Sequence, residues 1–136
     1  MIIDTFESLV DLKSGTILED GHENGVRYLI MRGPNSLCCY LGVPKDHPLA
    51  NRSYDDIPLD CHGGLTFSEK GDGEIRPEGW FWYGWDYGHA GDVSFDDLKY
   101  TMISSDEHKW IVEDVKKEIW LVTHSFRKLM KLVESR

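Results

Sequence analysis

Over the first ninety positions, apolar residues recur in short runs with strand character, separated by segments rich in glycine, proline and aspartate. The segments expected to form strands are residues 16–19, 26–31, 37–43, 59–67 (with a break at Gly63-Gly64) and 80–87. Residues 20–25 are expected to turn, and Gly33-Pro34-Asn35 should join the second and third segments as a β-hairpin. The pattern predicts an antiparallel sheet of about four to five strands.

Residues 80–87 form the most aromatic stretch of the chain. Strand alternation places one set of side chains on each face: Trp80, Trp82, Gly84 and Asp86 on the first, and Phe81, Tyr83, Trp85 and Tyr87 on the second. Because both faces carry rings, this segment is expected to be a central strand.

Two helices are expected, one near each end of the chain. Asp4 can cap a short helix, with Glu7 completing a capping box and Gly15 ending it. Residues 105–134 are expected to form one long helix, since apolar residues recur there at spacings of three and four: Val112, Val115, Ile119, Val122, Phe126, Leu129 and Val133.

A second apolar stripe lies beside that seam and consists of Trp110, Ile111, Trp120, Leu121 and Met130. One stripe can pack on the sheet while the other supports self-association. Alternatively, the two form a single broad stripe buried within one copy of the chain. The whole pattern predicts a single α+β domain, in which a short N-terminal helix and a long C-terminal helix pack on the sheet of a body spanning residues 1–104.

The chain of 136 residues has 15 basic and 24 acidic side chains, a net charge of −9. Clustered lysine and arginine are needed to bind a phosphate backbone or an anionic bilayer, so we expect neither a nucleic-acid polymer nor a membrane as partner. Three cysteines are too few for a disulfide scaffold, and no signal peptide or membrane span is evident. These features predict a protein of the cytoplasm.

Residues 44–58 form a long segment punctuated by three prolines. Leu49, Tyr54 and Ile57 can anchor it, which favours an ordered loop.

Three motifs place a histidine beside residues that let the backbone approach a ligand closely: Gly42-Val-Pro-Lys-Asp-His-Pro48, Asp60-Cys-His-Gly-Gly-Leu-Thr66 and Trp85-Asp-Tyr-Gly-His-Ala-Gly-Asp92. In a binding site, the polar wall would comprise His62, Gly63, Gly64 and Thr66. Trp85 or Tyr87 would stack on a base, Asp86 and His89 would contact its edge, and His47 and Arg52 would complete the site. This interpretation requires no cofactor.

Two catalytic interpretations stand beside it. A hydrolytic metal ion could be held by His62, Asp86, His89 and Asp92, although their spacing matches no familiar metal signature. Cys61 could act as a nucleophile, but neighbouring strand residues point to opposite faces, so His62 is poorly placed to activate it. A buried, unreactive Cys61 is favoured.

The three motifs resemble those of a family of small phage and prophage proteins of unassigned function, over about residues 38–92. In that family a cysteine often stands two residues before the histidine of the third motif, where this chain has Tyr87. Small phage proteins include sponges that sequester nucleotide immune signals of the bacterial host. The resemblance therefore implies a homo-oligomer that binds a small nucleotide-like ligand in the host cytoplasm. A metal-dependent hydrolase and an acidic inhibitor of a host enzyme remain as alternatives.

Overall fold

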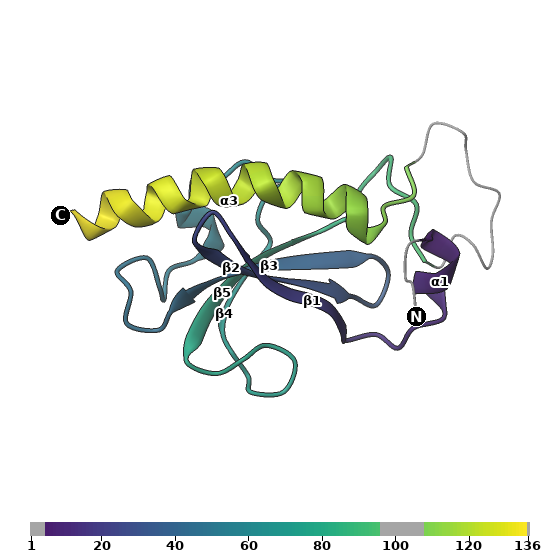
Figure 1. The fold of residues 1–136 in the computed structure, drawn as a ribbon, viewed down its shortest axis with the longest axis horizontal. Helices are drawn as coiled ribbons and strands as arrows, with labels where there is room; N and C mark the ends of the chain where they lie inside the picture. Colours follow the sequence, from purple (N-terminus) through teal and green to yellow (C-terminus); the bar gives the residue numbers. More distant parts are fainter. Residues whose placement is uncertain (1–4, 96–107, 136) are drawn as a thin grey trace.

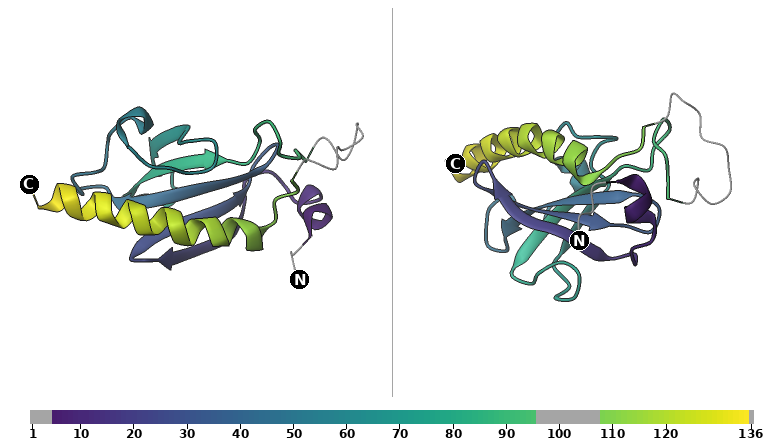
Figure 2. Two further views of the ribbon diagram at one scale, coloured as in Figure 1. Left: turned by 90° about the horizontal axis from the view of Figure 1, so that it is seen from above. Right: turned by 45° about the vertical axis from the view of Figure 1, so that its right-hand side comes forward.

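The computed structural model describes residues 5–95 and 108–135. Five antiparallel strands form one sheet in the order β1-β2-β3-β5-β4, and a long helix, α3, crosses one face (Figures 1 and 2). The elements are α1 (Phe6–Val10), β1 (Thr16–Glu23), β2 (Val26–Arg32), β3 (Leu37–Pro44), η1 (Tyr54–Asp56), β4 (Phe67–Lys70), β5 (Trp80–Asp86) and α3 (Val112–Glu134). The expected α+β architecture is confirmed.

β1 is longer than the sequence pattern predicts, and the expected turn over residues 20–25 is shorter. Asp20 to Glu23 continue the strand and pair with residues of β2, so that only Asn24 and Gly25 turn the chain. Both have positive φ, 52° and 76°, which suits the tight Asn-Gly hairpin turn. An ion pair of 2.7 Å between Arg27 and Asp20 further ties the two strands together.

β5 has the expected interior position, between β3 and β4, and its two faces enter different clusters. Phe81, Tyr83, Trp85 and the following Tyr87 lie in the main core with α3. On the opposite face, a second cluster contains Leu29, Met31, Tyr40 and Trp82. The loop 71–79 contacts this second cluster, because Trp82 donates a hydrogen bond to the Pro77 carbonyl and Arg76 lies over the rings of Tyr40 and Phe67.

The strand expected over residues 59–67 is wrong for all but its last residue. Gly63 and Gly64 both have positive φ, 70° and 79°, and Gly64 N–H donates to the Cys61 carbonyl. The chain therefore turns at His62 and Gly63, and regular pairing begins only at Phe67.

The long helix is confirmed, but it begins at Val112 and not near residue 105. Residues 105–107 lie outside the described residues. The backbone of His108 is committed to extended pairing, since its N–H donates to Gly91 and its carbonyl accepts from Val93. This pairing delays the start of the helix.

The seam of α3 packs on the sheet as expected, with Val115, Ile119, Val122 and Phe126 buried. The second apolar stripe, Trp110, Ile111, Trp120, Leu121 and Met130, is neither wholly buried nor wholly exposed. Met130 is buried and Trp110 and Ile111 are partly buried against the main core, whereas Trp120 is 51% exposed and Leu121 62% exposed.

At the N-terminal helix, Thr5 is the cap, and its hydroxyl accepts from Ser8 N–H at 3.2 Å. The expected cap, Asp4, lies outside the described residues, and Asp11, not Gly15, ends the helix. Glu7 pairs with Lys109 at 3.1 Å.

In the loop 44–58, Leu49 and Ile57 are buried, as expected for anchors, whereas Tyr54 is exposed. None of the helices in residues 5–95 and 108–135 has both the length and the apolar character that a bilayer span requires.

Candidate functional site

The second and third sequence motifs meet at a single buried carboxylate. Asp92 Oδ2 lies 2.7 Å from His62 Nε2 and accepts a hydrogen bond from His89 N–H at 3.0 Å. Asp92 Oδ1 accepts from Trp110 Nε1 at 2.7 Å. The Asp92 side chain is only 4% exposed. One carboxylate therefore joins the His62 turn, the segment after β5 and the approach to α3.

Aromatic rings also hold the His62 imidazole in place. The ring stacks on Tyr87 with centroids 4.5 Å apart, and Trp110 approaches it edge-on at 4.9 Å. Because the carboxylate of Asp92 can only accept, Nε2 of His62 carries a proton. In the tautomer with this single proton, Nδ1 is a hydrogen-bond acceptor.

Tyr87 links this histidine to α3. Its hydroxyl donates to Glu118 Oε1 at 2.7 Å and accepts from Trp85 Nε1 at 3.1 Å. Burial raises the pKa of the Tyr87 phenol well above its usual range. Trp85 and Tyr87 are both fully buried, so neither ring is open to a ligand base. The expected stacking role of these two residues is corrected by their place in the core.

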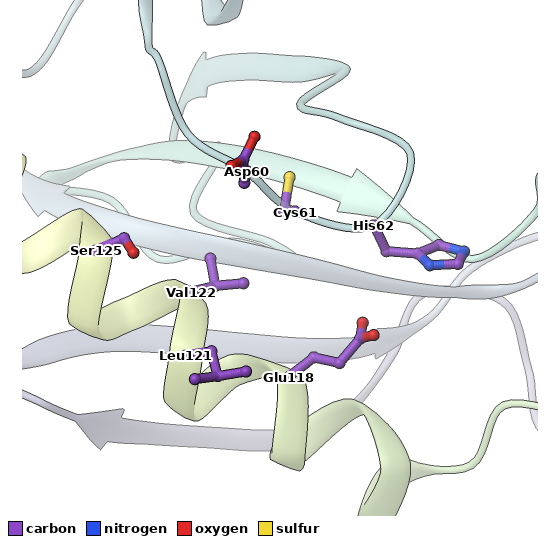
Figure 3. A pocket seen from close by; sticks show the side chains of 7 residues that line it. All are labelled: Asp60, Cys61, His62, Glu118, Leu121, Val122 and Ser125. Atoms are coloured by element: carbon purple, nitrogen blue, oxygen red, sulfur yellow. The ribbon is translucent and has the colours of Figure 1, made fainter.

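A cavity of about 340 Å³ lies between the His62 turn and α3. Its lining residues are Asp60, Cys61, His62, Glu118, Leu121, Val122 and Ser125. The side chains of His62 and Glu118 lie at one end of the cavity, and Asp60 and Ser125 lie toward the other (Figure 3). Leu121 and Val122 provide an apolar wall along the helix.

The thiol in this cavity is not activated. Burial, followed by the nearby charges of Asp60 and Glu118, raises the pKa of Cys61 to about 12. The thiolate is the reactive form of cysteine, so Cys61 is protonated and inert at neutral pH. This agrees with the unreactive Cys61 favoured from the sequence.

His89 and Asp86 form a neighbouring pair, with Nε2 of the histidine 3.3 Å from Oδ1 of the carboxylate. The His89 ring centroid lies 5.8 Å from that of His62. Gly63 packs directly against His89, since a Cβ on Gly63 would lie 2.2 Å from His89 Nε2. Glycine at position 63 therefore lets the His62 turn and the His89 segment come together.

The alternative metal set does not assemble as a ligand group. Over residues 5–95 and 108–135, no group of three or more histidine, cysteine, aspartate or glutamate side chains could hold an ion. The carboxylate of Asp92 is already engaged by His62, His89 and Trp110, which accounts for its unsuitability as a ligand.

The first motif lies elsewhere. His47 Nδ1 accepts from Leu49 N–H, and its Nε2 lies 3.2 Å from Glu134 Oε2 at the end of α3. Glu134 is sixteen residues beyond Glu118, about 24 Å along the helix axis. The Arg52 guanidinium donates to the Pro48 carbonyl. His47 and Arg52 are therefore not part of the His62 cavity, contrary to the expectation of one site.

Two further residues of the expected site, Gly64 and Thr66, are not among the residues that line the His62 cavity. A Cβ added to Gly64 would have no atom of the described residues within 4 Å, so this glycine faces open space beside the cavity-lining residues. Thr66 lines a separate hollow together with Cys38, Tyr40 and Asp86. Of the expected polar wall, only His62 lines the cavity, and Gly63 supports it.

Glu118 and Trp110 are the residues that sequence reasoning missed. Glu118 is an acidic residue whose neighbours three residues before it and four after it, Val115 and Val122, are buried. A carboxylate beside a buried helical seam is the signal that could have identified it. Trp110 could have been found only as a member of the second apolar stripe.

Comparison of the chain with known protein families, curated proteins and solved structures finds no match. The resemblance of its motifs to phage proteins stays a prediction.

Proposed function

We propose that this chain binds a small nucleotide-like ligand and sequesters it without turnover, as a phage-encoded protein that counters host defence. The observation that carries the proposal is a cavity of about 340 Å³ that is lined by Glu118 and by His62, whose Nε2 is held by Asp92. Small-molecule sites have this order of size and combine an apolar wall with a few fixed polar groups.

The polar groups of the cavity are suited to the edge of a nucleobase. Nδ1 of His62 and the carboxylates of Asp60 and Glu118 are acceptors for ring N–H and amino donors. Leu121 and Val122 offer contact to the face of the ring. Phosphate groups would be repelled by the two carboxylates and would lie outside the cavity.

Sequestration is favoured over turnover by the state of the cavity's nucleophiles. Cys61 is a protonated thiol, and within the described residues no hydrogen bond joins the Ser125 hydroxyl to His62. An activated nucleophile needs an adjacent base or a lowered pKa, and the opposite shift is found at Cys61.

Self-association through α3 is part of the proposal. Leu121 is 62% exposed and Leu132 is 55% exposed, eleven residues apart on the outer face of the helix. Exposed leucines aligned along one helix are typical of a contact surface for a second helix.

The test is native mass spectrometry of the purified protein with a panel of cyclic di- and trinucleotides. We expect discrete mass shifts that persist for hours. We also expect His62→Ala to raise the dissociation constant by about ten- to a hundredfold, the usual effect of losing a buried polar partner. His47→Ala, at the other end of α3, is the matched control and should bind normally.

Disappearance of the added nucleotide would contradict sequestration and favour a hydrolase. The absence of any bound or consumed nucleotide would contradict both, and would favour an acidic inhibitor of a host enzyme.

A further inference from the structure

A cationic cleft lies on the other flank of α3, facing the tip of the β1–β2 hairpin. Its volume is about 290 Å³, and it is lined by Asn24, His124, Arg127, Lys128 and Lys131. Three of these five side chains carry a positive charge, in a chain that has 24 acidic and only 15 basic residues. This local cluster of positive charge contrasts with the net negative charge of the protein.

These cations are weakly neutralised. Within residues 5–95 and 108–135, Arg127 has one carboxylate partner, Glu134, at 3.8 Å, and that same carboxylate oxygen lies 3.2 Å from His47. Among the described residues, neither Lys128 nor Lys131 has a carboxylate within 4.0 Å. Other cations of the chain do find partners, as Lys116 does with Glu19 at 3.3 Å.

The helix dipole explains only part of this cluster. Lys131 lies in the last turn of α3, where a cation stabilises the helix end. The effect falls off within one turn, so it does not account for Arg127 and Lys128.

The walls of the cleft are held in place. Asn24 Nδ2 donates to the Trp120 carbonyl at 2.9 Å and to Thr123 Oγ1 at 3.2 Å, which docks the hairpin tip on the helix. Gly25 leaves room for Arg127, whose Nε is 3.6 Å from the position of a Cβ on Gly25.

An exposed aromatic surface adjoins the cations. The rings of Trp120 and His124 are parallel within 5°, with centroids 6.0 Å apart, and the Trp120 side chain is half exposed. Parallel exposed rings are suited to stacking on a planar heterocycle.

We propose that this cleft binds the phosphate groups of a small phosphorylated ligand, with a planar ring of the ligand stacked beside Trp120 and His124. Arg127 can contact two phosphate oxygens at once, and Lys128 and Lys131 act as additional positive charges. A nucleotide has both features. The net charge of −9 disfavours a nucleic-acid polymer as the occupant.

The cleft is a site separate from the His62 cavity, whose carboxylates disfavour phosphate. The inference therefore does not depend on the function proposed for His62.

The test is isothermal titration calorimetry with pyrophosphate and with ADP at low and at high ionic strength. We expect both to bind, ADP the more tightly, and both to weaken as salt screens the cations. A double variant, Lys128→Gln with Lys131→Gln, should weaken both by about tenfold or more. Trp120→Ala should weaken ADP and leave pyrophosphate unchanged.

Two controls isolate the cleft. Lys13→Gln removes one positive charge, as each of the two cleft substitutions does, from an exposed lysine just before the start of β1, at the end far from the hairpin tip. It should leave binding unchanged. His62→Ala should also leave the binding of pyrophosphate unchanged, so that failure of one site is distinguished from failure of the other.

Lys13, Trp120, Lys128 and Lys131 are exposed, so substitutions at these positions should leave the fold intact. Circular dichroism of each variant, His62→Ala included, checks this. The proposal is overturned if neither probe binds, or if the double variant binds both as tightly as the original chain. Binding of an acidic peptide without binding of pyrophosphate would also overturn it.

Discussion

His62 and Asp92 are thirty residues apart in the chain, yet Nε2 of the histidine lies 2.7 Å from Oδ2 of the carboxylate. The carboxylate is almost completely buried, and its two oxygens also accept from His89 N–H and Trp110 Nε1. A buried carboxylate is tolerated only when its lone pairs are satisfied by donors. Asp92 is therefore a structural centre that also fixes the orientation of the His62 ring at one end of the cavity.

Replacement of Asp92 should be strongly destabilising. Asp92→Ala removes three hydrogen bonds and leaves the N–H of His89 and Nε1 of Trp110 without their acceptor. We expect the free energy of unfolding to fall by roughly 3 kcal/mol, as measured by urea denaturation. Asp60→Ala is the control, because Asp60 is an exposed cavity residue, and it should change stability by less than about 0.5 kcal/mol. Equal effects of the two substitutions would contradict the central role of Asp92.

Stability should decline in mildly alkaline solution. Burial, together with the nearby charge of Asp86, raises the pKa of the Cys38 thiol from 9.0 to about 11. The unfolded chain then loses this proton at lower pH than the folded protein, so ionisation favours unfolding as the pH rises. The contribution is fully present below pH 9 and is lost progressively toward pH 11.

Urea unfolding at a series of pH values measures this decline. Cys38→Ala should reduce its slope between pH 9 and 11 by up to about 1.4 kcal/mol per pH unit. Cys61 and the buried tyrosines Tyr28 and Tyr40 shift in the same direction, so some decline will remain. An unchanged slope in the variant would refute the assignment to Cys38.

The strands were predictable where a short apolar segment of the sequence lies between turn residues. Residues 26–31, 37–43 and 80–87 are nearly continuous apolar runs bounded by turn residues, and the observed strands agree with them to within one residue at each end. Residues 59–66 were misassigned because apolar side chains also alternate there, whereas two glycines with positive φ turn the backbone away. At His108, pairing with Gly91 and Val93 overrides a helical pattern.

The site was less predictable, because its contacts depend on packing between distant segments. The sequence places His62 and Asp92 in separate motifs, and nothing local indicates that they pair. Tyr87 and Glu118 are likewise 31 residues apart. His47 stands in an equally prominent motif, yet the topology carries it to the opposite end of α3.

The exposed leucines of α3 should control self-association. Leu132→Glu is the more informative change, because Leu121 also lines the His62 cavity and Leu132 does not. We expect this charge to shift the protein toward monomers in sedimentation velocity, with little change in thermal stability, since the side chain is 55% exposed. Ile17→Glu, at an exposed apolar residue of β1, is the control. A protein that is monomeric before substitution, or a variant that still assembles, would contradict self-association through this face.

Gly63 and Gly64 offer a matched pair that separates backbone strain from packing. Both have φ in the left-handed region, 70° and 79°, so an alanine at either position has a similar conformational cost of about 1–2 kcal/mol. At position 63 the added Cβ would clash, at 2.2 Å from His89 Nε2, whereas at position 64 it would have no neighbour within 4 Å in the part of the chain that the structure describes. We therefore expect Gly63→Ala to lower the free energy of unfolding clearly more than Gly64→Ala. Gly63→Ala should also shift the imidazole NMR signals of His89, because that ring must move, while Gly64→Ala leaves them in place. Equal losses of stability with unmoved His89 signals would show that the two motifs do not pack together as described.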